Sequence, residues 1–304
     1  MPNIQIVFLG TSCSAPTKER NLSSVALKFE GNTLLFDCPE GTQRQMMRSG
    51  ISYMRIEHIF ISHLHADHLL GLPGLIATMS MHRRDYPLNI YGPKGISERV
   101  KTALKLALMQ CNFEVRTKEI MREGTILQGK DFSVKAVKLK HDIPCYGFVF
   151  EEIGKAGEFN KKKALELGIP EGPLFGKLQN GEIISIGGKK IAPAQVMDYT
   201  KARKGRKICY ITDTLPGAQY IPAIRDADVL IHESAFLEKM KERAKETFHC
   251  TAKQAGEIAE RAHVKALYLI HISPRHKDVK QSENEARMVF ANSIAPNDLD
   301  AVEL

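Results

Sequence analysis

Tryptophan is absent from the 304-residue chain, and aromatic residues make up only 7% of it. A protein that binds single-stranded nucleic acid by stacking bases on aromatic rings would need more of them. No apolar run reaches the length of about 18 residues that indicates a membrane-spanning helix. Residues 1–4 lead into a predicted strand without a basic segment or a cleavage site. We therefore expect neither a secretory signal nor a membrane anchor.

Paired cysteines are also missing. The sequence contains no C-x-x-C pair and far fewer cysteines than a small disulfide scaffold. This distribution predicts reduced thiols in a cytoplasmic protein and argues against zinc bound by thiolates. The six cysteines are Cys13, Cys38, Cys111, Cys145, Cys209 and Cys250.

Length and charge set the broad class. A chain of this size can bury a large core without disulfides or structural metals, so we expect one domain over 1–304 with an inserted piece. Forty-three Lys and Arg against 35 Asp and Glu give a formal net charge of +8, which favours a polyanionic partner such as nucleic acid. Because aromatic residues are few, recognition of the backbone and shape of a nucleic acid fits this sequence better than stacking of bases on aromatic rings.

The strongest chemical signal directly follows a short apolar run at residues 58–61. There His63, His65, Asp67 and His68 stand at H-x-H-x-D-H spacing. Imidazole nitrogen and carboxylate oxygen bind Zn²⁺ at about 2.0–2.2 Å, and this spacing suits two adjacent metal ions better than one. Asp67 could instead cap a helix predicted over 69–81. Capping alone does not explain three histidines within six residues.

Other polar residues stand at the ends of predicted strands. Residues 112–117 and 131–140 are predicted as strands of a second antiparallel set, and His141 follows the latter. Thr251 is the predicted N-cap of a helix over 252–262, with His249 at its entrance. Because α/β folds place functional residues on the loops after strands, these side chains are candidates for one site. The strand-end candidates are His141, Asp213, Glu233 and His271.

Two basic segments stand apart from this pattern. Residues 153–204 show Gly, Pro and Lys in place of core periodicity, including Lys161, Lys162, Lys163, Gly172 and Pro173. We expect an inserted arm, and a long basic insertion is a candidate nucleic-acid contact. The loop over 16–21 carries Lys18 and Arg20, for which a solvated surface loop is the simple alternative.

Taken together, these residues resemble the ribonuclease Z family of the metallo-β-lactamase superfamily, whose signature is H-x-H-x-D-H. The resemblance implies an α/β, four-layer αββα sandwich with two zinc ions at one edge and an inserted flexible arm. It also implies a zinc-dependent endoribonuclease that removes the 3′ trailer from precursor tRNA. Further matching segments are Phe8-Leu9-Gly10-Thr11-Ser12, Pro16-x-Lys18-x-Arg20-Asn21, Glu40-Gly41-Thr42-Gln43, Tyr91-Gly92-Pro93-x-Gly95, His249-x-Thr251-Ala252 and His271-Ile272-Ser273.

The resemblance also implies roles for single residues. One zinc would be held by His63, His65 and His141, and the other by Asp67, His68 and His271, with Asp213 bridging the two. His249, hydrogen-bonded to Glu233, would act at the scissile phosphate or the leaving group. Residues 153–204 would grip the tRNA from the partner subunit of a homodimer. Lys18 and Arg20 would meet the 3′ end of the tRNA. Independently of the resemblance, Arg275 directly after the last ligand motif is a candidate phosphate contact, with an ordinary surface arginine as the default alternative.

Two positions depart from the family pattern. Pro39 stands where the family usually has Gly, and Leu215 stands where Arg is common. Neither change removes a ligand. The presence of Leu215 leaves open whether this chain performs the role of that arginine.

The chemistry follows from two metal ions about 3.5–4 Å apart, which can direct an activated water in line with phosphorus. No attack by a 2′-hydroxyl is needed, so a cut after the discriminator base would leave a 3′-hydroxyl on the tRNA and a 5′-phosphate on the trailer. Asp67 is either a ligand alone or also the acceptor of the water's proton. His249 is the candidate donor to the departing oxygen, with a structural His–Glu pair as the alternative.

Two other functions compete with this interpretation. A small-molecule metallo-hydrolase of the same fold, acting on a phosphodiester or a thioester, explains the metal positions equally well. It does not explain the basic arm or the loop with Lys18 and Arg20. A non-catalytic nucleic-acid-binding protein with structural metals is less consistent, because structural zinc sites are usually closed and mononuclear.

Overall fold

The computed structural model describes residues 4–106, 111–276 and 278–304, and these divide into two compact units. The sandwich unit comprises the described residues of 1–128, 134–150 and 207–304. The insert unit comprises residues 129–133 and 151–206. Each unit has its own hydrophobic core, so each is described by itself.

The first sheet of the sandwich unit has seven strands. In spatial order these are β18 (Ala301–Glu303), β1 (Gln5–Gly10), β2 (Ser24–Phe29), β3 (Asn32–Phe36), β4 (Ile56–Phe60), β5 (Leu88–Pro93) and β6 (Val115–Ile120). The strands from β18 to β3 pair antiparallel, whereas β3, β4, β5 and β6 run parallel.

Strand β6 corrects one expectation, since residues 112–117 were predicted to join the second sheet. Val115 instead pairs with Leu88 of β5, in parallel register. The helix α4 (Ile96–Leu106) connects the two strands, and such a β-α-β crossover returns the chain parallel to its starting strand. The sequence pattern predicts an amphipathic helix over about 97–109 here, and the end of that prediction lies outside the described residues.

The second sheet also has seven strands, of which β14 to β17 run parallel. In spatial order these are β17 (Ser293–Ile294), β16 (Leu267–Ile270), β15 (Val229–Glu233), β14 (Lys207–Ile211), β9 (Cys145–Glu152), β8 (Phe132–Leu139) and β7 (Gly124–Gln128). Because β14, β15 and β16 are parallel neighbours, their carboxyl ends meet at one edge of the sheet.

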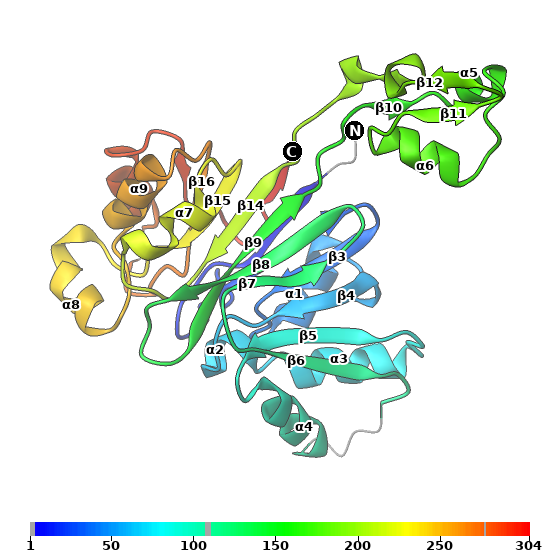
Figure 1. Ribbon diagram of the computed structural model, residues 1–304. Coiled ribbons are helices and arrows are strands. Elements are labelled where there is room, and N and C mark those ends of the chain that lie inside the picture. Colours follow the sequence, from blue (N-terminus) through cyan, green and yellow to red (C-terminus); the bar gives the residue numbers. More distant parts are fainter. Residues whose placement is uncertain (1–3, 107–110, 277) are drawn as a thin grey trace. The chain divides into compact units, whose positions relative to one another are not determined.

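Aromatic side chains fill the space between the two sheets. The ring of Phe36 on β3 lies 5.9 Å from that of Phe148 on β9 and 5.5 Å from that of Tyr210 on β14. Apolar side chains on the outer faces pack under helices, which gives the predicted order of helix, sheet, sheet and helix (Figure 1). The first sheet is covered by α1 (Thr42–Ser49), α3 (Leu72–Met81) and α4, and the second by α7 (Ile221–Ile224), α9 (Ala252–Arg261) and α10 (Lys280–Arg287).

Local sequence signals explain how two of these helices begin. The hydroxyl of Thr251 accepts the backbone N–H of Gln254 at 3.2 Å, and the Gln254 side chain accepts the N–H of Thr251 at 3.0 Å. This capping box confirms the predicted start of α9. The helix predicted over 69–81 is two helices, α2 (Ala66–Leu69) and α3. A Cβ on Gly71, between them, would lie 2.0 Å from the carbonyl oxygen of Pro39, so this close approach requires glycine.

Residues 153–204, predicted as an inserted basic arm, contain short helices and strands around a small core. The elements are β10 (Glu158–Phe159), α5 (Lys161–Glu166), α6 (Pro173–Gln179), β11 (Ile184–Ile186), β12 (Lys189–Ile191) and β13 (Met197–Asp198). They enclose the buried side chains of Ala164, Ile169, Leu178, Ile184, Ile191 and Val196. Because these elements are only two to seven residues long, their buried positions give no readable period.

Buried ion pairs join the two ends of the insert unit. The carboxylate of Glu152 accepts hydrogen bonds from Arg203 at 2.5 Å and from Arg206 at 2.8 Å. Burial alone would raise the pKa of Glu152, but these two guanidinium groups lower it to about 2. These pairs therefore connect the two ends of the segment predicted as an inserted arm over 153–204.

All six cysteines lie within the described residues and are free thiols. Burial raises the pKa of the Cys13 thiol to about 12, so this side chain is a poor nucleophile. No helix in the described part of the chain is both long and apolar enough to cross a membrane.

Candidate active site

Polar side chains from five separate segments meet at one edge of the sandwich unit. Three histidines and an aspartate come from the segment after β4 and from α2, and three further residues follow β8, β14 and β16. The structure thus brings together all seven residues that the sequence predicts as metal ligands. They are His63, His65, Asp67, His68, His141, Asp213 and His271.

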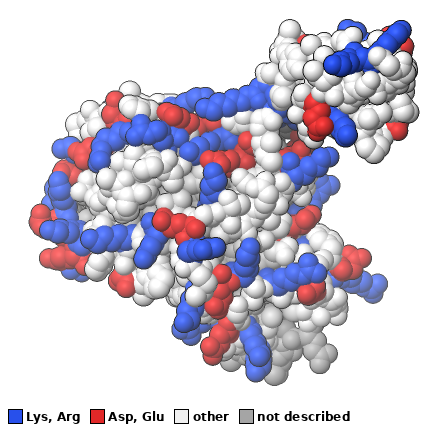
Figure 2. Space-filling view, in the orientation of Figure 1, with Lys and Arg blue, Asp and Glu red and all other residues white. Residues whose placement is uncertain are grey.

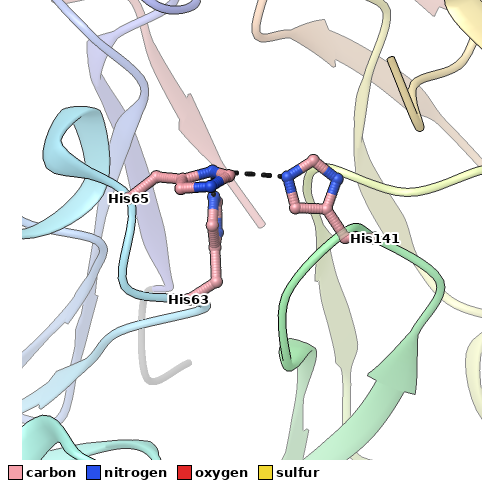
Figure 3. A group of neighbouring side chains, drawn as sticks. All are labelled: His63, His65 and His141. Carbon is pink, nitrogen blue, oxygen red and sulfur yellow. Dashed lines mark hydrogen bonds between the residues drawn. The ribbon is translucent and has the colours of Figure 1, made fainter. Parts of the chain in front are cut away.

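The first group consists of His63, His65 and His141, which point toward one another (Figure 3). Nε2 of His63 lies 3.0 Å from Nδ1 of His65, and Nε2 of His141 lies 3.4 Å from the same atom. Burial and the neighbouring histidines hold the pKa of His63 well below its usual value. The imidazole of His63 is therefore neutral, which is the form that binds a metal.

The second group consists of Asp67, His68 and His271. Nε2 of His68 is buried and has no hydrogen-bond partner among the described residues. It lies 3.7 Å from Oδ2 of Asp67 and 3.5 Å from Oδ1 of Asp213. Burial lowers the pKa of His68, but the surrounding carboxylates outweigh this effect and raise it to about 10. The carboxylates around His68 therefore favour a positive charge at this side chain.

Asp213 lies between the two groups. Its Oδ2 is 3.1 Å from Nε2 of His271 and 3.7 Å from Nε2 of His63, while its Oδ1 faces His68. Burial raises the pKa of Asp213, yet the adjacent imidazoles hold it well below its usual value. Its carboxylate is thus ionised and reaches ligands of both groups, as a bridging residue requires.

The donor set fits a metal centre. Imidazole nitrogens and carboxylate oxygens are ligands for Zn²⁺ and for other divalent transition metals. A buried nitrogen such as Nε2 of His68 is costly unless it has a partner, and a metal ion supplies one. The clustered donors indicate a metal cofactor.

Asp37 belongs to the site, although the sequence analysis did not predict it. Its fully buried carboxylate accepts Nδ1–H of His68 at 2.8 Å, the hydroxyl of Tyr210 at 2.8 Å and the backbone N–H of Ser62 at 2.7 Å. Because a carboxylate only accepts, Nδ1 of His68 carries a proton, and in the neutral ring Nε2 is the nitrogen left to bind a metal. Asp37 directly follows β3, so its position at the end of a strand is the sequence feature that could have identified it as a site residue.

The half-buried His249 and the buried Glu233 form a pair beside the cluster. Nδ1 of His249 lies 3.0 Å from Oε1 of Glu233, which also accepts the backbone N–H of Thr214 at 2.8 Å. Burial lowers the pKa of His249, but the Glu233 carboxylate outweighs it and raises the pKa to about 9. The ring of His249 stacks on that of His271 at 5.4 Å. A protonated imidazole is therefore held against the ligand cluster at neutral pH.

The loop over 16–21 is anchored within the protein. The guanidinium of Arg20 donates to the hydroxyl of Thr11 at 2.6 Å and to the carbonyl of Pro296 at 2.8 Å. Nearby, the backbone N–H of Ser14 donates to Oδ2 of Asp67 at 3.0 Å, which connects this region to the ligand cluster. Lys18 is exposed. The alternative of a solvated surface loop therefore fits Lys18 but not Arg20, whose side chain is hydrogen-bonded within the protein.

The remaining predicted tRNA contacts lie on the surface of the two units. Arg275 is exposed in the sandwich unit. In the insert unit Lys161, Lys162 and Lys163 are exposed in the first turn of α5, and Lys161 pairs with Glu171 at 2.8 Å. Gly172, at φ 141°, and Pro173 mark the start of α6.

Charge is not spread evenly along the sequence. Residues 153–204 contain ten Lys and Arg against five Asp and Glu, so this segment carries five of the eight net positive charges. On the face shown in Figure 2, Lys and Arg side chains are interspersed with Asp and Glu. The excess of positive charge is therefore concentrated in residues 153–204.

Comparison with known proteins identifies the family. A family model for the anti-Pycsar protein Apyc1 matches residues 4–157, and a model for the beta-lactamase superfamily domain matches residues 180–272. A ribonuclease Z of Methanosarcina mazei is 44% identical over 302 residues, covering 99% of this chain and 98% of that protein. The chain belongs to the ribonuclease Z family. A ribonuclease Z of Methanosarcina acetivorans is 42% identical over 302 residues, again covering 99% and 98%.

A solved structure agrees with this assignment. Human tRNase Z, short form, superimposes with a TM-score of 0.71 at 28% identity, covering 98% of each chain. The predicted ribonuclease Z family and the predicted metallo-β-lactamase fold are thus confirmed.

Proposed function

We propose that this ribonuclease Z homologue is a metal-dependent endoribonuclease that removes the 3′ trailer from precursor tRNA. The full-length relatives are ribonucleases Z, and the human structural neighbour is a tRNase Z. The observation that carries the proposal is the convergence of seven nitrogen and oxygen donors, with Asp213 between the two groups. Such an arrangement suits the hydrolysis of a phosphodiester.

In this proposal the metal ions are two Zn²⁺ per subunit. His63, His65 and His141 would hold one, Asp67, His68 and His271 the other, and Asp213 would touch both. When bound, the two ions would act as Lewis acids toward the phosphate and lower the pKa of a coordinated water from 15.7 to about 7.

Residues of the chain would supply the proton transfers. The pKa of Asp67 is lowered because His68 outweighs the effect of burial, so its carboxylate is ionised at neutral pH. Asp67 can therefore serve as a ligand and can also accept a proton from the attacking water. His249, protonated and positioned by Glu233, would donate to the departing 3′-oxygen. The products would be a tRNA ending in a 3′-hydroxyl after the discriminator base and a trailer with a 5′-phosphate.

The insert unit would be the flexible arm that binds tRNA phosphates, through Lys161, Lys162 and Lys163 and the turn at Gly172 and Pro173. Its excess of five positive charges supports this role. Lys18, Arg20 and Arg275 would contact the tRNA near its 3′ end. We further propose that the enzyme acts in the cytoplasm as a homodimer in which each arm serves the partner's site.

The direct test is incubation of the purified protein with a precursor tRNA that carries a 3′ trailer. We expect one metal-dependent cut after the discriminator base, lost on chelation and in His65→Ala. Raising the salt concentration is expected to weaken binding of the precursor. If the metal-loaded protein left precursor tRNA intact but hydrolysed bis(p-nitrophenyl) phosphate or a thioester, a small-molecule hydrolase of the same fold would be the better description.

A further inference from the structure

One carboxylate at the edge of the ligand cluster has no role in the proposed metal centre. Asp142 directly follows His141 after β8, and its side chain is 48% exposed, whereas that of His141 is 3% exposed. Oδ1 of Asp142 lies 3.0 Å from Nε2 of His141, and Oδ2 of Asp142 lies 3.6 Å from Nε2 of His65. Asp142 is therefore next to two of the three histidines in the first group of candidate ligands.

Backbone contacts hold the end of β8, from which both residues project. The backbone N–H of Lys140 donates to the hydroxyl of Thr214 at 3.1 Å, and the carbonyl of Lys140 accepts the N–H of Leu215 at 2.9 Å. These bonds tie the chain directly before His141 to the segment after β14, which carries Asp213. The turn with His141 and Asp142 thus starts from a point that is fixed beside the cluster.

The ring of His141 is oriented with Nε2 toward the cluster. Nδ1 lies 3.3 Å from the carbonyl oxygen of Phe248, and because a carbonyl only accepts, Nδ1 carries a proton. In the neutral ring Nε2 is then the nitrogen that can bind a metal. Nε2 faces Nδ1 of His65 at 3.4 Å (Figure 3). The carboxylate of Asp142 lies beside Nε2 and therefore reaches the side of the ring that would face the metal.

The spacing of Asp142 is that of a ligand. Two atoms bound to one ion at about 2.0–2.2 Å lie about 2.8–3.6 Å apart when the angle between the bonds is about 90–110°. Nδ1 of His65 meets this condition with His63, at 3.0 Å, and with His141, at 3.4 Å. The 3.0 Å between Asp142 and His141 falls in the same range. Oδ2 of Asp213, the predicted bridging group, is farther from Nε2 of His141, at 4.0 Å.

The distribution of charge gives a second reason. The first group of candidate ligands consists of imidazoles alone, whereas the second group has a carboxylate of its own, Asp67. Asp213 lies between the groups and is shared. With Asp142, each of two divalent ions would have one carboxylate of its own and a share of Asp213. Because Asp142 is about half exposed, little desolvation opposes its contact with an ion.

We propose that Asp142 is an additional oxygen ligand of the metal ion held by His63, His65 and His141, and that it adapts this position to Mn²⁺. The proposal rests on the metal centre of the proposed function. Imidazole nitrogen suits Zn²⁺, whereas carboxylate oxygen suits ions such as Mn²⁺ that accept octahedral oxygen coordination. Asp142 therefore influences the choice of metal as well as the strength of binding.

The test is a titration of the metal-free protein with metal in the absence of RNA. Zn²⁺ and Mn²⁺ are titrated separately by calorimetry into the wild type, Asp142→Ala and Asp142→Asn. Co²⁺ is titrated as well, because its visible absorption strengthens as the number of ligands falls. Asp85→Asn is the matched control, since Asp85 is also an exposed aspartate but lies in the loop that leads into β5. The thermal midpoint of each metal-free variant checks its folding.

Asp142→Ala is expected to weaken Mn²⁺ binding at one of the two positions about 10- to 100-fold. Zn²⁺ binding is expected to weaken less, so the ratio of the two Kd values changes. The visible bands of the Co²⁺ protein are expected to become stronger, because one ligand is lost. Asp142→Asn should lie between the wild type and Asp142→Ala, since an amide oxygen is a weaker ligand, and Asp85→Asn should match the wild type.

Unchanged Kd values for both ions in Asp142→Ala would overturn the proposal. Equal losses for Zn²⁺ and Mn²⁺ with unchanged Co²⁺ bands would also overturn it, because Asp142 would then only orient His65 from outside the coordination sphere. Either result would leave the proposed function intact, since the wild type would still bind metal and cut precursor tRNA. A wild type that bound no metal would overturn both. A wild type that bound metal as expected but left precursor tRNA intact would overturn the proposed function alone.

Discussion

Replacing Glu233 by Gln tests how the site controls its proton donor. The substitution keeps the size and the acceptor oxygen of a side chain that is fully buried at the end of β15. It removes the negative charge 3.0 Å from Nδ1 of His249. Because that charge outweighs the effect of burial and raises the pKa of His249, its loss is expected to bring the pKa back toward its ordinary value.

The size of the effect depends on pH. With a pKa of about 9, His249 is about nine-tenths protonated at pH 8. With the ordinary value of 6.5, only about 3% would be protonated at pH 8 and about three quarters at pH 6. If protonated His249 is the acid, Glu233→Gln should lower kcat/KM about 30-fold at pH 8 but only about 1.3-fold at pH 6. The alkaline limb of the profile should move to lower pH.

The assay is the pH dependence of kcat/KM for a precursor tRNA, measured for the wild type and the variant with equal metal content. Glu238→Gln is the control, because the Glu238 carboxylate accepts the hydroxyl of Thr251 and is not among the main groups that raise the pKa of His249. An equal loss of activity at pH 6 and pH 8 would refute the reasoning. In that case the pair would be structural, and the donor would be another group.

Three further predictions concern the metal centre and the fold. Asp37→Asn is expected to weaken metal binding about 10- to 100-fold, because it removes the carboxylate that orients His68; unchanged affinity in a metal titration would contradict this role. Removing the metal with a chelator is expected to lower the thermal midpoint, since a metal held at 100 times its Kd stabilises the folded state by about 2.7 kcal/mol. Asp213→Asn should not respond to the chelator, and an equal response in both proteins would argue against binding at Asp213. Thr251→Ala is expected to destabilise the protein by about 1 kcal/mol through loss of the α9 cap, measured by denaturant unfolding. Thr247→Ala is the control, because the Thr247 hydroxyl bonds only within its own turn, and equal losses in the two variants would contradict a capping role.

The candidate ligands could be predicted because each stands in a short motif or at the end of a strand. His141, Asp213 and His271 follow β8, β14 and β16, and adjacent strand ends bring them together. Asp37 follows β3 in the same way, but no other residue of its segment is a ligand. Its role depends on contacts with His68 and Tyr210 that are distant in sequence.

Sheet membership could not be predicted from local pattern. Residues 145–152 form a central strand of the second sheet, yet they are buried along almost their whole length and show no alternation. Residues 115–120 alternate weakly, and only the crossover through α4 decides that they join the first sheet. The core of the insert unit could not be predicted for a similar reason, since each of its short helices and strands contributes at most one buried residue.

The central claim is that water, directed by the metal centre, attacks phosphorus at the junction between tRNA and trailer. Cleavage of a precursor tRNA in ¹⁸O-labelled water, with mass spectrometry of both fragments, tests it most directly. We predict that the label enters the 5′-phosphate of the trailer and that the tRNA ends in an unlabelled 3′-hydroxyl after the discriminator base. A 2′,3′-cyclic phosphate on the tRNA, or a label at its 3′ end, would contradict the account.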